Sequence, residues 1–164
     1  MDALADGLKA LERKFGRVQY ETVEIACSSR DRYREEMGEN LQRRLFSFER
    51  LFSRDALPEI KATCHKIEPQ FADVVGDFIF RTVNIDPGIM SPEHFVIASH
   101  REYNHRIYLR DGVFAQIQLI WSQGRFHQLP WTNQDFCEGE AIEFFQRVRA
   151  SFEQIDEYEQ LTSR

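Results

Sequence analysis

The chain has 164 residues, of which 42% are apolar and 29% are charged, and this composition excludes disordered, collagen-like and membrane-spanning proteins. Its 27 acidic and 21 basic residues give a formal net charge of -6. An acidic chain is a poor match for a broad nucleic-acid or anionic-membrane surface, so we expect neither partner.

The first third of the chain is predicted to form one helix and two strands. Apolar residues at helical spacing precede Gly16, namely Leu4, Leu8, Leu11 and Phe15. Residues 18–26 are rich in β-branched side chains and predict a strand. Residues 41–52 fit either a strand or a helix, and we favour the strand. The arginines of this segment, Arg43, Arg44 and Arg50, are expected on an exposed face.

The middle of the chain is predicted to contain another helix and two more strands. Asp55 is expected to cap this helix, and Pro69 to end it. Its apolar stripe consists of Leu57, Ile60, Cys64 and Ile67. Residues 78–84 (FIFRTVN) predict a buried strand, and residues 94–99 predict the next one after a turn at residues 85–88.

Residues 105–129 have the clearest strand pattern, that of a three-stranded meander. Residues 110–112 and 122–124 are predicted as three-residue loops, each ending in a glycine that accepts positive φ. The pairs expected on a core side are Leu109 with Val113, Ile107 with Ala115, and His105 with Ile117. The pairs expected on the other side are Tyr108 with Phe114, Arg106 with Gln116, and Asn104 with Gln118. The second loop is expected to place Ile120 opposite Phe126 and Gln118 opposite Gln128.

The C-terminal part, from residue 138, is predicted to be helical. Its apolar positions at helical spacing are Ala141, Phe144, Phe145, Val148, Phe152, Ile155 and Tyr158. Together the elements predict an α+β fold in a single domain over residues 1–164, with a mainly antiparallel sheet of about five to seven strands. About three helices are expected to pack on one face of this sheet.

Polar and aromatic side chains are predicted to share one face of the meander. They are Asn104, Arg106, Gln116, Gln118 and Gln128, beside Trp131 and Thr132. Arginine binds planar anions through two hydrogen bonds and tryptophan stacks on flat rings, so this set suits a phosphate, a carboxylate or a base-bearing ligand. The alternative is the solvated face of an antiparallel sheet.

Candidates for metal binding and for acid–base catalysis each have a structural alternative. His100, His105 and Asp86 are candidates for a metal site, but hydrogen-bonded structural histidines are the alternative, and we expect no metal. Asp86, Asp111 and Asp135 lie in or beside turns, where backbone hydrogen bonding is the alternative to a role as general base. Neither GxxxxGK[ST] nor GxGxxG occurs, so we expect no cofactor.

The cysteines indicate a reducing compartment. Cys27, Cys64 and Cys137 are odd in number and far apart, so we expect reduced thiols. The first 16 residues contain no apolar signal-peptide core. We therefore expect a cytoplasmic protein.

Several segments, in their order and spacing, carry a family resemblance. They are YREEMGENLQRRLFSFERL at 33–51, IK at 60–61, NIDPG at 84–88, HRIYL at 105–109, DGVFAQIQLI at 111–120, LPWT at 129–132, Asp135 and EFFQRVR at 143–149. The chain thereby resembles an uncharacterised bacterial family, catalogued as domain-of-unknown-function family 4416. The resemblance implies a glutamate at 116 and a threonine at 118, where this chain has glutamines. It implies no reaction.

Two functions from different classes follow. The first is a cytosolic protein, either a binding protein or an enzyme, that holds a small anionic or nucleotide-like ligand around Arg106. Its candidate ligand-binding residues are Arg101, Arg106, Tyr108, Gln116, Trp131, Asp86 and Asp135. The second is a non-catalytic interaction module or homo-oligomer, for which the 14 phenylalanines leave spare apolar surface.

Overall fold

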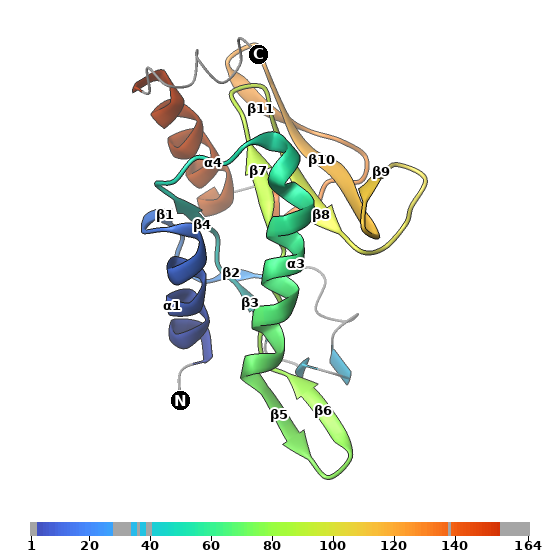
Figure 1. Cartoon of the computed structure of the whole chain (residues 1–164). Coiled ribbons are helices and arrows are strands. Elements are labelled where there is room, and N and C mark those ends of the chain that lie inside the picture. The colour runs from blue at the N-terminus through green and yellow to red at the C-terminus, as the bar shows by residue number, and fades with distance from the viewer. Residues whose placement is uncertain (1–2, 28–33, 36, 39–40, 138, 155–164) are drawn as a thin grey trace.

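The computed structural model describes residues 3–27, 34–35, 37–38, 41–137 and 139–154, and within them the fold is mixed α+β (Figure 1). Its α-helices are α1 (Ala3–Phe15), α3 (Leu57–Ile67) and α4 (Gly139–Ser151). Short 3-10 turns are η1 (Arg54–Ala56), η2 (Glu68–Phe71), η3 (Gln134–Phe136) and η4 (Phe152–Gln154). Ile155 and Tyr158, expected at the end of the last helix, lie outside the described residues.

The main sheet has five antiparallel strands in the described chain. They are β7 (Gly88–Met90), β8 (His94–Ser99), β9 (Ile107–Arg110), β10 (Val113–Ser122) and β11 (Arg125–Gln128). Their order is β11-β10-β8-β7, and β9 also pairs with β10. Two-stranded pairs are β1 (Val18–Glu21) with β4 (Phe46–Phe48), β2 (Ile25–Ala26) with β3 (Gln42–Arg43), and β5 (Ala72–Val75) with β6 (Phe78–Arg81). The strand predicted at 41–52 is therefore confirmed as two short strands.

Helix α3 confirms its predicted stripe but not its predicted cap. Leu57, Cys64 and Ile67 are buried, and Pro69 lies in the 3-10 turn that follows. The cap position of α3 is Ala56, which has no capping side chain, so the prediction for Asp55 is wrong. Hydrogen bonds from the Ser53 side chain and from its own backbone N–H lower the pKa of Asp55, because they favour its charged form.

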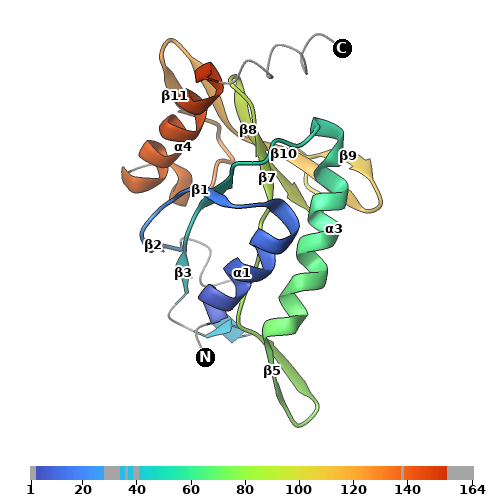
Figure 2. The same cartoon turned by 60° about the vertical axis from the view of Figure 1, so that its left-hand side comes forward.

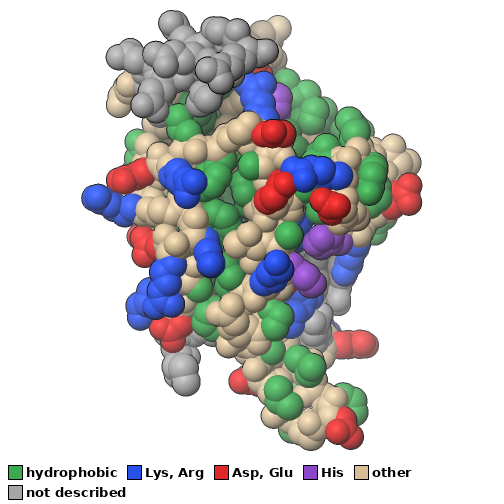
Figure 3. Space-filling model, in the orientation of Figure 1, with side chains coloured by type: hydrophobic (Ala, Val, Ile, Leu, Met, Phe, Trp, Pro, Cys, Tyr) green, Lys and Arg blue, Asp and Glu red, His purple; other side chains and the backbone are tan. Residues whose placement is uncertain are grey.

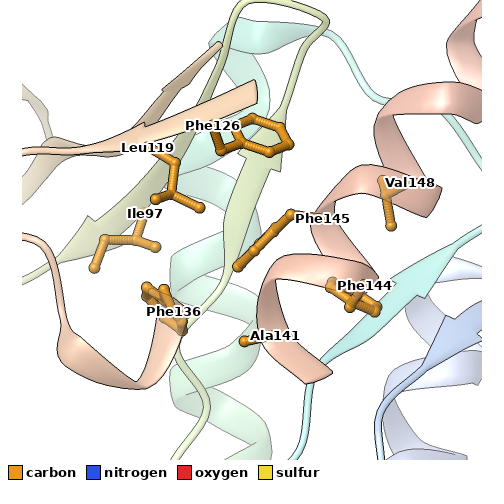
Figure 4. Close-up of a cluster of buried hydrophobic side chains, with 8 residues drawn as sticks. All are labelled: Ile97, Leu119, Phe126, Phe136, Ala141, Phe144, Phe145 and Val148. Carbon is orange, nitrogen blue, oxygen red and sulfur yellow. The ribbon is translucent and has the colours of Figure 1, made fainter. Parts of the chain in front are cut away.

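Helices pack on both faces of the main sheet, so the expectation of one covered face is wrong. Alternate residues of β8 point to opposite faces. Ile97 packs in a cluster with Phe145 of α4, whereas the next residue, Ala98, packs in a cluster with Leu57 of α3. Figures 2 and 4 show the two helices on either side of the strands.

The larger core lies between α4 and the sheet (Figure 4). Phe145 is 1% exposed, and its ring contacts those of Phe95 and Phe136 at centroid distances of 4.7 and 5.6 Å. Tyr20 and Leu45, from the N-terminal part of the chain, pack against the same cluster. The core therefore joins segments that are far apart in the sequence.

The meander is confirmed, but its turns are shorter than predicted. Arg110 pairs with Val113 and Ser122 with Arg125, so each loop has two residues rather than three. All four loop residues have positive φ, as a type I′ turn requires, and they are Asp111, Gly112, Gln123 and Gly124. Type I′ turns match the twist of the strands, which makes them the favoured two-residue hairpins.

These turns change part of the predicted register. Tyr108 opposite Phe114 and Ile107 opposite Ala115 are confirmed, but Val113 faces Arg110 instead of Leu109. The other corrections are Trp121 opposite Phe126 and Leu119 opposite Gln128, where Ile120 and Gln118 were expected. A two-residue loop moves the pairing by one position, and this accounts for the second hairpin. In the first hairpin an irregularity between Val113 and Phe114 restores the predicted register beyond the turn.

Strand β9 does not face the core as expected. Ile107 is 68% exposed and Leu109 39%. Helix α3 covers the neighbouring Ala98 and Val113, whereas all four residues of β9 are exposed. The predicted core side of the meander therefore reaches beyond the helix.

The prediction that residues 78–84 form a buried strand is also wrong. Its first half is β6, which pairs with β5 in a hairpin that projects from the lower end of the molecule (Figure 1). Large apolar side chains of the hairpin are exposed, namely Val74, Val75, Phe78, Ile79 and Phe80. A short apolar run identifies a strand but does not say whether anything covers it.

Candidate functional site

The predicted site residues fall into two groups in the structure. Arg106 contacts Gln116, while Asp86 and Asp135 lie beside Arg43. We call the first group the Arg106 cluster (Ser99, Arg101, Tyr103, His105, Arg106, Gln116 and Trp131) and the second the Arg43 cluster (Arg43, Lys61, Asp86 and Asp135).

The guanidinium of Arg106 is held by the protein itself. Its Nε donates to Gln116 Oε1 at 2.6 Å, and its Nη1 donates to Ser99 Oγ and to the Arg101 carbonyl, both at 2.7 Å. The guanidinium carbon also lies 4.7 Å from the centre of the Tyr103 ring. The predicted pairing of Arg106 with Gln116 is therefore confirmed as a hydrogen bond, and Arg106 fixes the segment before β9.

Three rings form a stack beside this guanidinium. The His105 ring lies between those of Tyr103 and Trp131, at centroid distances of 5.8 and 5.0 Å. The indole N–H of Trp131 donates to the Ile117 carbonyl at 2.8 Å, and Gln116 Nε2 donates to the Trp131 carbonyl at 3.4 Å. Trp131 thus closes over the polar side of β10.

This closure buries two polar side chains of the sheet, whereas Asn104 and Gln128 of the same predicted set are exposed. Gln116 is 3% exposed and Gln118 is 0% exposed, so the solvated-face interpretation is wrong for both. Thr132 Oγ1 donates to the Gln118 carbonyl at 2.5 Å, and the Asn133 N–H donates to Gln118 Oε1 at 2.9 Å. The segment after β11 therefore covers the glutamines.

Two other predicted residues contribute less. The exposed Arg101 provides its backbone carbonyl to Arg106. Tyr108 is 58% exposed, and its ring packs edge-on against Phe114 at 5.3 Å. Both residues therefore lie at the rim of the sheet.

The Arg43 cluster is a chain of alternating charges. Arg43 Nη1 lies 3.3 Å from Asp135 Oδ2, and Arg43 Nη2 lies 3.9 Å from Asp86 Oδ2. Lys61 Nζ lies 3.9 Å from Asp86 Oδ1 and donates to the Ile85 carbonyl at 3.2 Å. Four elements far apart in the sequence meet here: β3, α3, the turn before β7, and η3.

Most of this cluster is withdrawn from water. The side chain of Asp135 is 1% exposed, that of Lys61 10%, that of Arg43 14% and that of Asp86 37%. Arg43 also lies over the ring of Phe136, with 5.1 Å between the guanidinium carbon and the ring centre. Buried charges are costly unless they are paired, and each cation here has a carboxylate beside it.

Two buried donors have no hydrogen-bond acceptor among the described residues. They are Arg43 Nη1, for which the 3.3 Å approach of Asp135 is an ion pair but not a hydrogen bond, and Gln118 Nε2. The backbone N–H of Asn133, two residues before Asp135, donates to Gln118 Oε1, so the segment that covers Gln118 leads directly into η3, which carries Asp135. A buried donor without an acceptor costs about 1–3 kcal/mol.

A neighbouring set of contacts fixes the turn that carries Asp86. Buried Glu68 accepts from the Ile85 N–H at 2.7 Å and from Arg81 Nη1 at 3.3 Å. Arg81 Nη1 also donates to Asn84 Oδ1 at 3.3 Å. The turn is thereby held against α3 and the base of the hairpin, which sets the position of Asp86.

Sequence patterns placed Gln118 in the polar set around Arg106, though not among the candidate ligand-binding residues. They did not single out Arg43 or Lys61 for ligand binding, although the spacing of both residues holds a signal. Arg43 was expected on an exposed face, which is wrong. In an extended segment it alternates with Arg44 and shares its side with the partly buried Leu45. Lys61 lies four residues after Leu57 and three before Cys64, so helical spacing places it in the buried stripe.

The histidines and Cys64 have other partners. His105 contacts Asn104 and Gln116, while the His100 ring lies 5.4 Å from that of His65. In the described part of the chain no three His, Cys, Asp or Glu residues are gathered so as to hold a metal. Burial raises the pKa of Cys64 to about 12, so its thiol is protonated at neutral pH.

Comparison with known proteins places the chain in a family. No helix among the described residues is long and apolar enough to cross a membrane. No curated protein and no solved structure matches the chain significantly. One family model, described as a domain of unknown function, matches residues 2–152. The match covers most of the chain and confirms the predicted resemblance, so the chain belongs to the family of domain of unknown function DUF4416.

Proposed function

We propose that this protein binds a small anionic ligand at the Arg43 cluster. The observation that carries the proposal is the buried donor Arg43 Nη1, which has no hydrogen-bond acceptor in the described chain; Gln118 Nε2, outside the cluster, is a second buried donor of this kind. Both are N–H donors, so both call for an oxygen acceptor. A phosphate or carboxylate group supplies several such oxygens.

The long ion pairs of the cluster support the same ligand. Arg43 and Lys61 each stand 3.9 Å from Asp86, whereas charge-assisted hydrogen bonds measure about 2.7–2.9 Å. Both cations therefore converge on the carboxylate without a hydrogen bond to it. Ligand oxygens would satisfy these donors better than Asp86 does.

The charge balance narrows the ligand class. The two cations and two carboxylates of the cluster cancel, so a bare anion would meet repulsion from Asp86. A molecule that carries an oxyanion together with hydroxyl or N–H groups suits this cluster. Its oxyanion would accept hydrogen bonds from Arg43 and Lys61, and its hydroxyl or N–H groups would donate to Asp86. Nucleotides, sugar phosphates and hydroxycarboxylates meet this description. Asp86 is the most exposed of the four side chains, so we expect a ligand to approach the cluster from its side.

The Arg106 cluster is a weaker location for this ligand. Arg106 already donates to a side-chain amide, a hydroxyl and a carbonyl at 2.6–2.7 Å. A ligand there would have to replace these short bonds. The three cysteines are free, which supports the cytoplasmic setting that we propose for the protein.

The test is thermal stability against nucleotides, sugar phosphates, hydroxycarboxylates and inorganic phosphate. A ligand at about 100 times its dissociation constant adds about 2.7 kcal/mol, which raises the melting temperature by several degrees. Arg43→Lys keeps the charge beside Asp135 but removes the second nitrogen of the fork, so we expect it to lose the shift.

Two variants distinguish the locations. Arg44→Lys, at the next residue, changes a surface pair with Glu21 and should keep the full shift. Arg106→Ala should keep it as well. A shift lost in Arg106→Ala but kept in Arg43→Lys would move the site to the Arg106 cluster. The absence of a shift from every compound would contradict the proposed binding.

A further inference from the structure

The β5–β6 hairpin is an apolar arm with two bare faces. Val74 and Ile79 share one face and are 69% and 67% exposed. Val75 and Phe78 share the other and are 63% and 70% exposed. Figures 1 and 3 show the arm extending from the lower end of the molecule, with hydrophobic and acidic side chains on it.

The base of this arm is anchored although its end is bare. Arg81 is paired with the buried Glu68, and the Thr82 hydroxyl donates to the Phe71 carbonyl. An isolated two-stranded hairpin is marginally stable in water, because it has no third element to cover it. The anchor holds the arm in place, so its uncovered edge and faces are available to another chain.

The outer edge of β6 is unpaired in the described sheet, which contains only β5 and β6. The pair that closes a two-residue hairpin exchanges both hydrogen bonds, and here it is Val75 with Phe78. The next residue, Ile79, therefore directs its N–H and C=O away from β5. By the same alternation Arg81 directs its N–H and C=O outward too, and Asp77, in the turn before β6, lies at the end of this edge.

The sequence along this edge is complementary to itself. Residues 77–81 read Asp-Phe-Ile-Phe-Arg. This segment can pair antiparallel with a second copy of itself, with Ile79 on the two-fold axis. Asp77 of each copy then faces Arg81 of the other copy, and Phe78 of each copy faces Phe80 of the other. Ile79 then pairs with Ile79 of the second copy through its outward-directed N–H and C=O, as an antiparallel ladder requires. Opposite charges and aromatic pairs across strands both stabilise such a ladder.

We propose that β6 pairs with β6 of a second copy of this chain, so that two hairpins form one four-stranded sheet across a two-fold axis. The contact is isologous, since each residue meets the same partner in both directions. Asp77 of each copy adds a carboxylate to the Arg81 guanidinium, whose five donors serve both it and Glu68. The inference is independent of the proposed ligand site.

The test is disulfide trapping at the axis. Opposite residues that exchange hydrogen bonds have Cα atoms about 5.5 Å apart, which suits a disulfide. Ile79→Cys should therefore form a covalent dimer under a mild oxidant. Val74→Cys is the matched control: it lies directly opposite Ile79 and is equally exposed, but it belongs to the outer strand. Its distance to its own copy would be about 14 Å, three strand spacings, so it should not form the dimer.

A charge variant tests the register. Asp77→Lys in the Ile79→Cys background replaces two attractive pairs by two repulsive ones and should slow trapping about tenfold. The wild-type chain, with its three native cysteines, is run in parallel and should form no dimer. Equal trapping of the two cysteine variants, no trapping of Ile79→Cys up to the solubility limit, or indifference to Asp77→Lys would each overturn the proposal. Sedimentation of the wild-type chain should show a mass that rises with concentration toward the dimer, and higher oligomers instead would contradict it.

Discussion

Gln116 and Gln118 show that an alternating strand pattern predicts which side chains are neighbours but not which side of the strand is buried. The alternation correctly places Arg106 beside Gln116. It does not say which side of the strand is covered, and here Trp131 and the segment around Thr132 close over the polar side. The cover depends on where the chain returns after β11, and no local pattern encodes that path.

The sequence around Lys61 predicts that this lysine is buried, although no functional role was assigned to it. Its helical position among Leu57, Cys64 and Ile67 predicts burial. A lysine is rarely buried without a partner, so such a position indicates a nearby carboxylate. The carboxylate is Asp86, which lies 25 residues further along, and sequence spacing could not have identified it.

His94 gives a pH-dependent stability. Burial, followed by repulsion from Arg54, lowers the pKa of His94 from its ordinary value of 6.5 in the folded chain. The unfolded chain then binds a proton more readily, so the contribution of His94 to the free energy of unfolding is fully present above about pH 6.5 and decreases as the pH falls below it. We expect the loss of stability between about pH 7.5 and about pH 5.5 to be smaller in His94→Gln than in the wild type.

Urea denaturation at both pH values measures this difference. Identical pH dependence in His94→Gln and the wild type would show that His94 does not titrate differently on unfolding.

The two tight turns of the meander are the elements on which sequence and structure differ most instructively. A glycine correctly marks each turn, but the residue before it decides the loop length, because both positions take positive φ in a type I′ turn. Asp111 tolerates this conformation better than Gln123 does, since short Asx side chains are enriched there. The sequence therefore predicts that the strands reverse, whereas their register depends on one ambiguous residue.

Gln123→Asn should stabilise the second turn. Asn-Gly is the preferred pair for a type I′ turn, so we expect the free energy of unfolding to rise by about 0.5 kcal/mol. Gln146→Asn makes the same chemical change on an exposed turn of α4, where asparagine is the poorer helix former, and should lower stability slightly. Urea midpoints compare both variants with the wild type. A loss of stability in Gln123→Asn would argue against the two-residue turn.

For the molecule as a whole, sequence patterns predicted the α+β class and the three helices but not how they are arranged. Adjacent residues of β8, such as Ile97 and Ala98, are both buried because helices lie on both faces. A strand buried on both sides and an exposed hairpin such as β6 have similar apolar sequences. Only the tertiary arrangement distinguishes them.

A single domain predicts a single unfolding transition. Tryptophan fluorescence follows Trp121 in β10 and Trp131 in the Arg106 cluster, and far-ultraviolet circular dichroism follows the backbone of all elements. We expect the two urea transitions to coincide, as they do when a domain of this size unfolds in one step. Two separated midpoints would show that part of the chain unfolds on its own.

The packing of β1 against α4 has a consequence for synthesis. The ring of Tyr20 lies under the guanidinium of Arg147 at 4.7 Å and packs against the core that Phe144 and Val148 help to form. The ribosome adds residue 20 long before residue 147, so the apolar residues around β1 cannot be buried until most of the chain has been translated. The nascent polypeptide therefore exposes these apolar side chains until α4 has been synthesised. A chaperone can bind this N-terminal segment for longer than any later part of the chain.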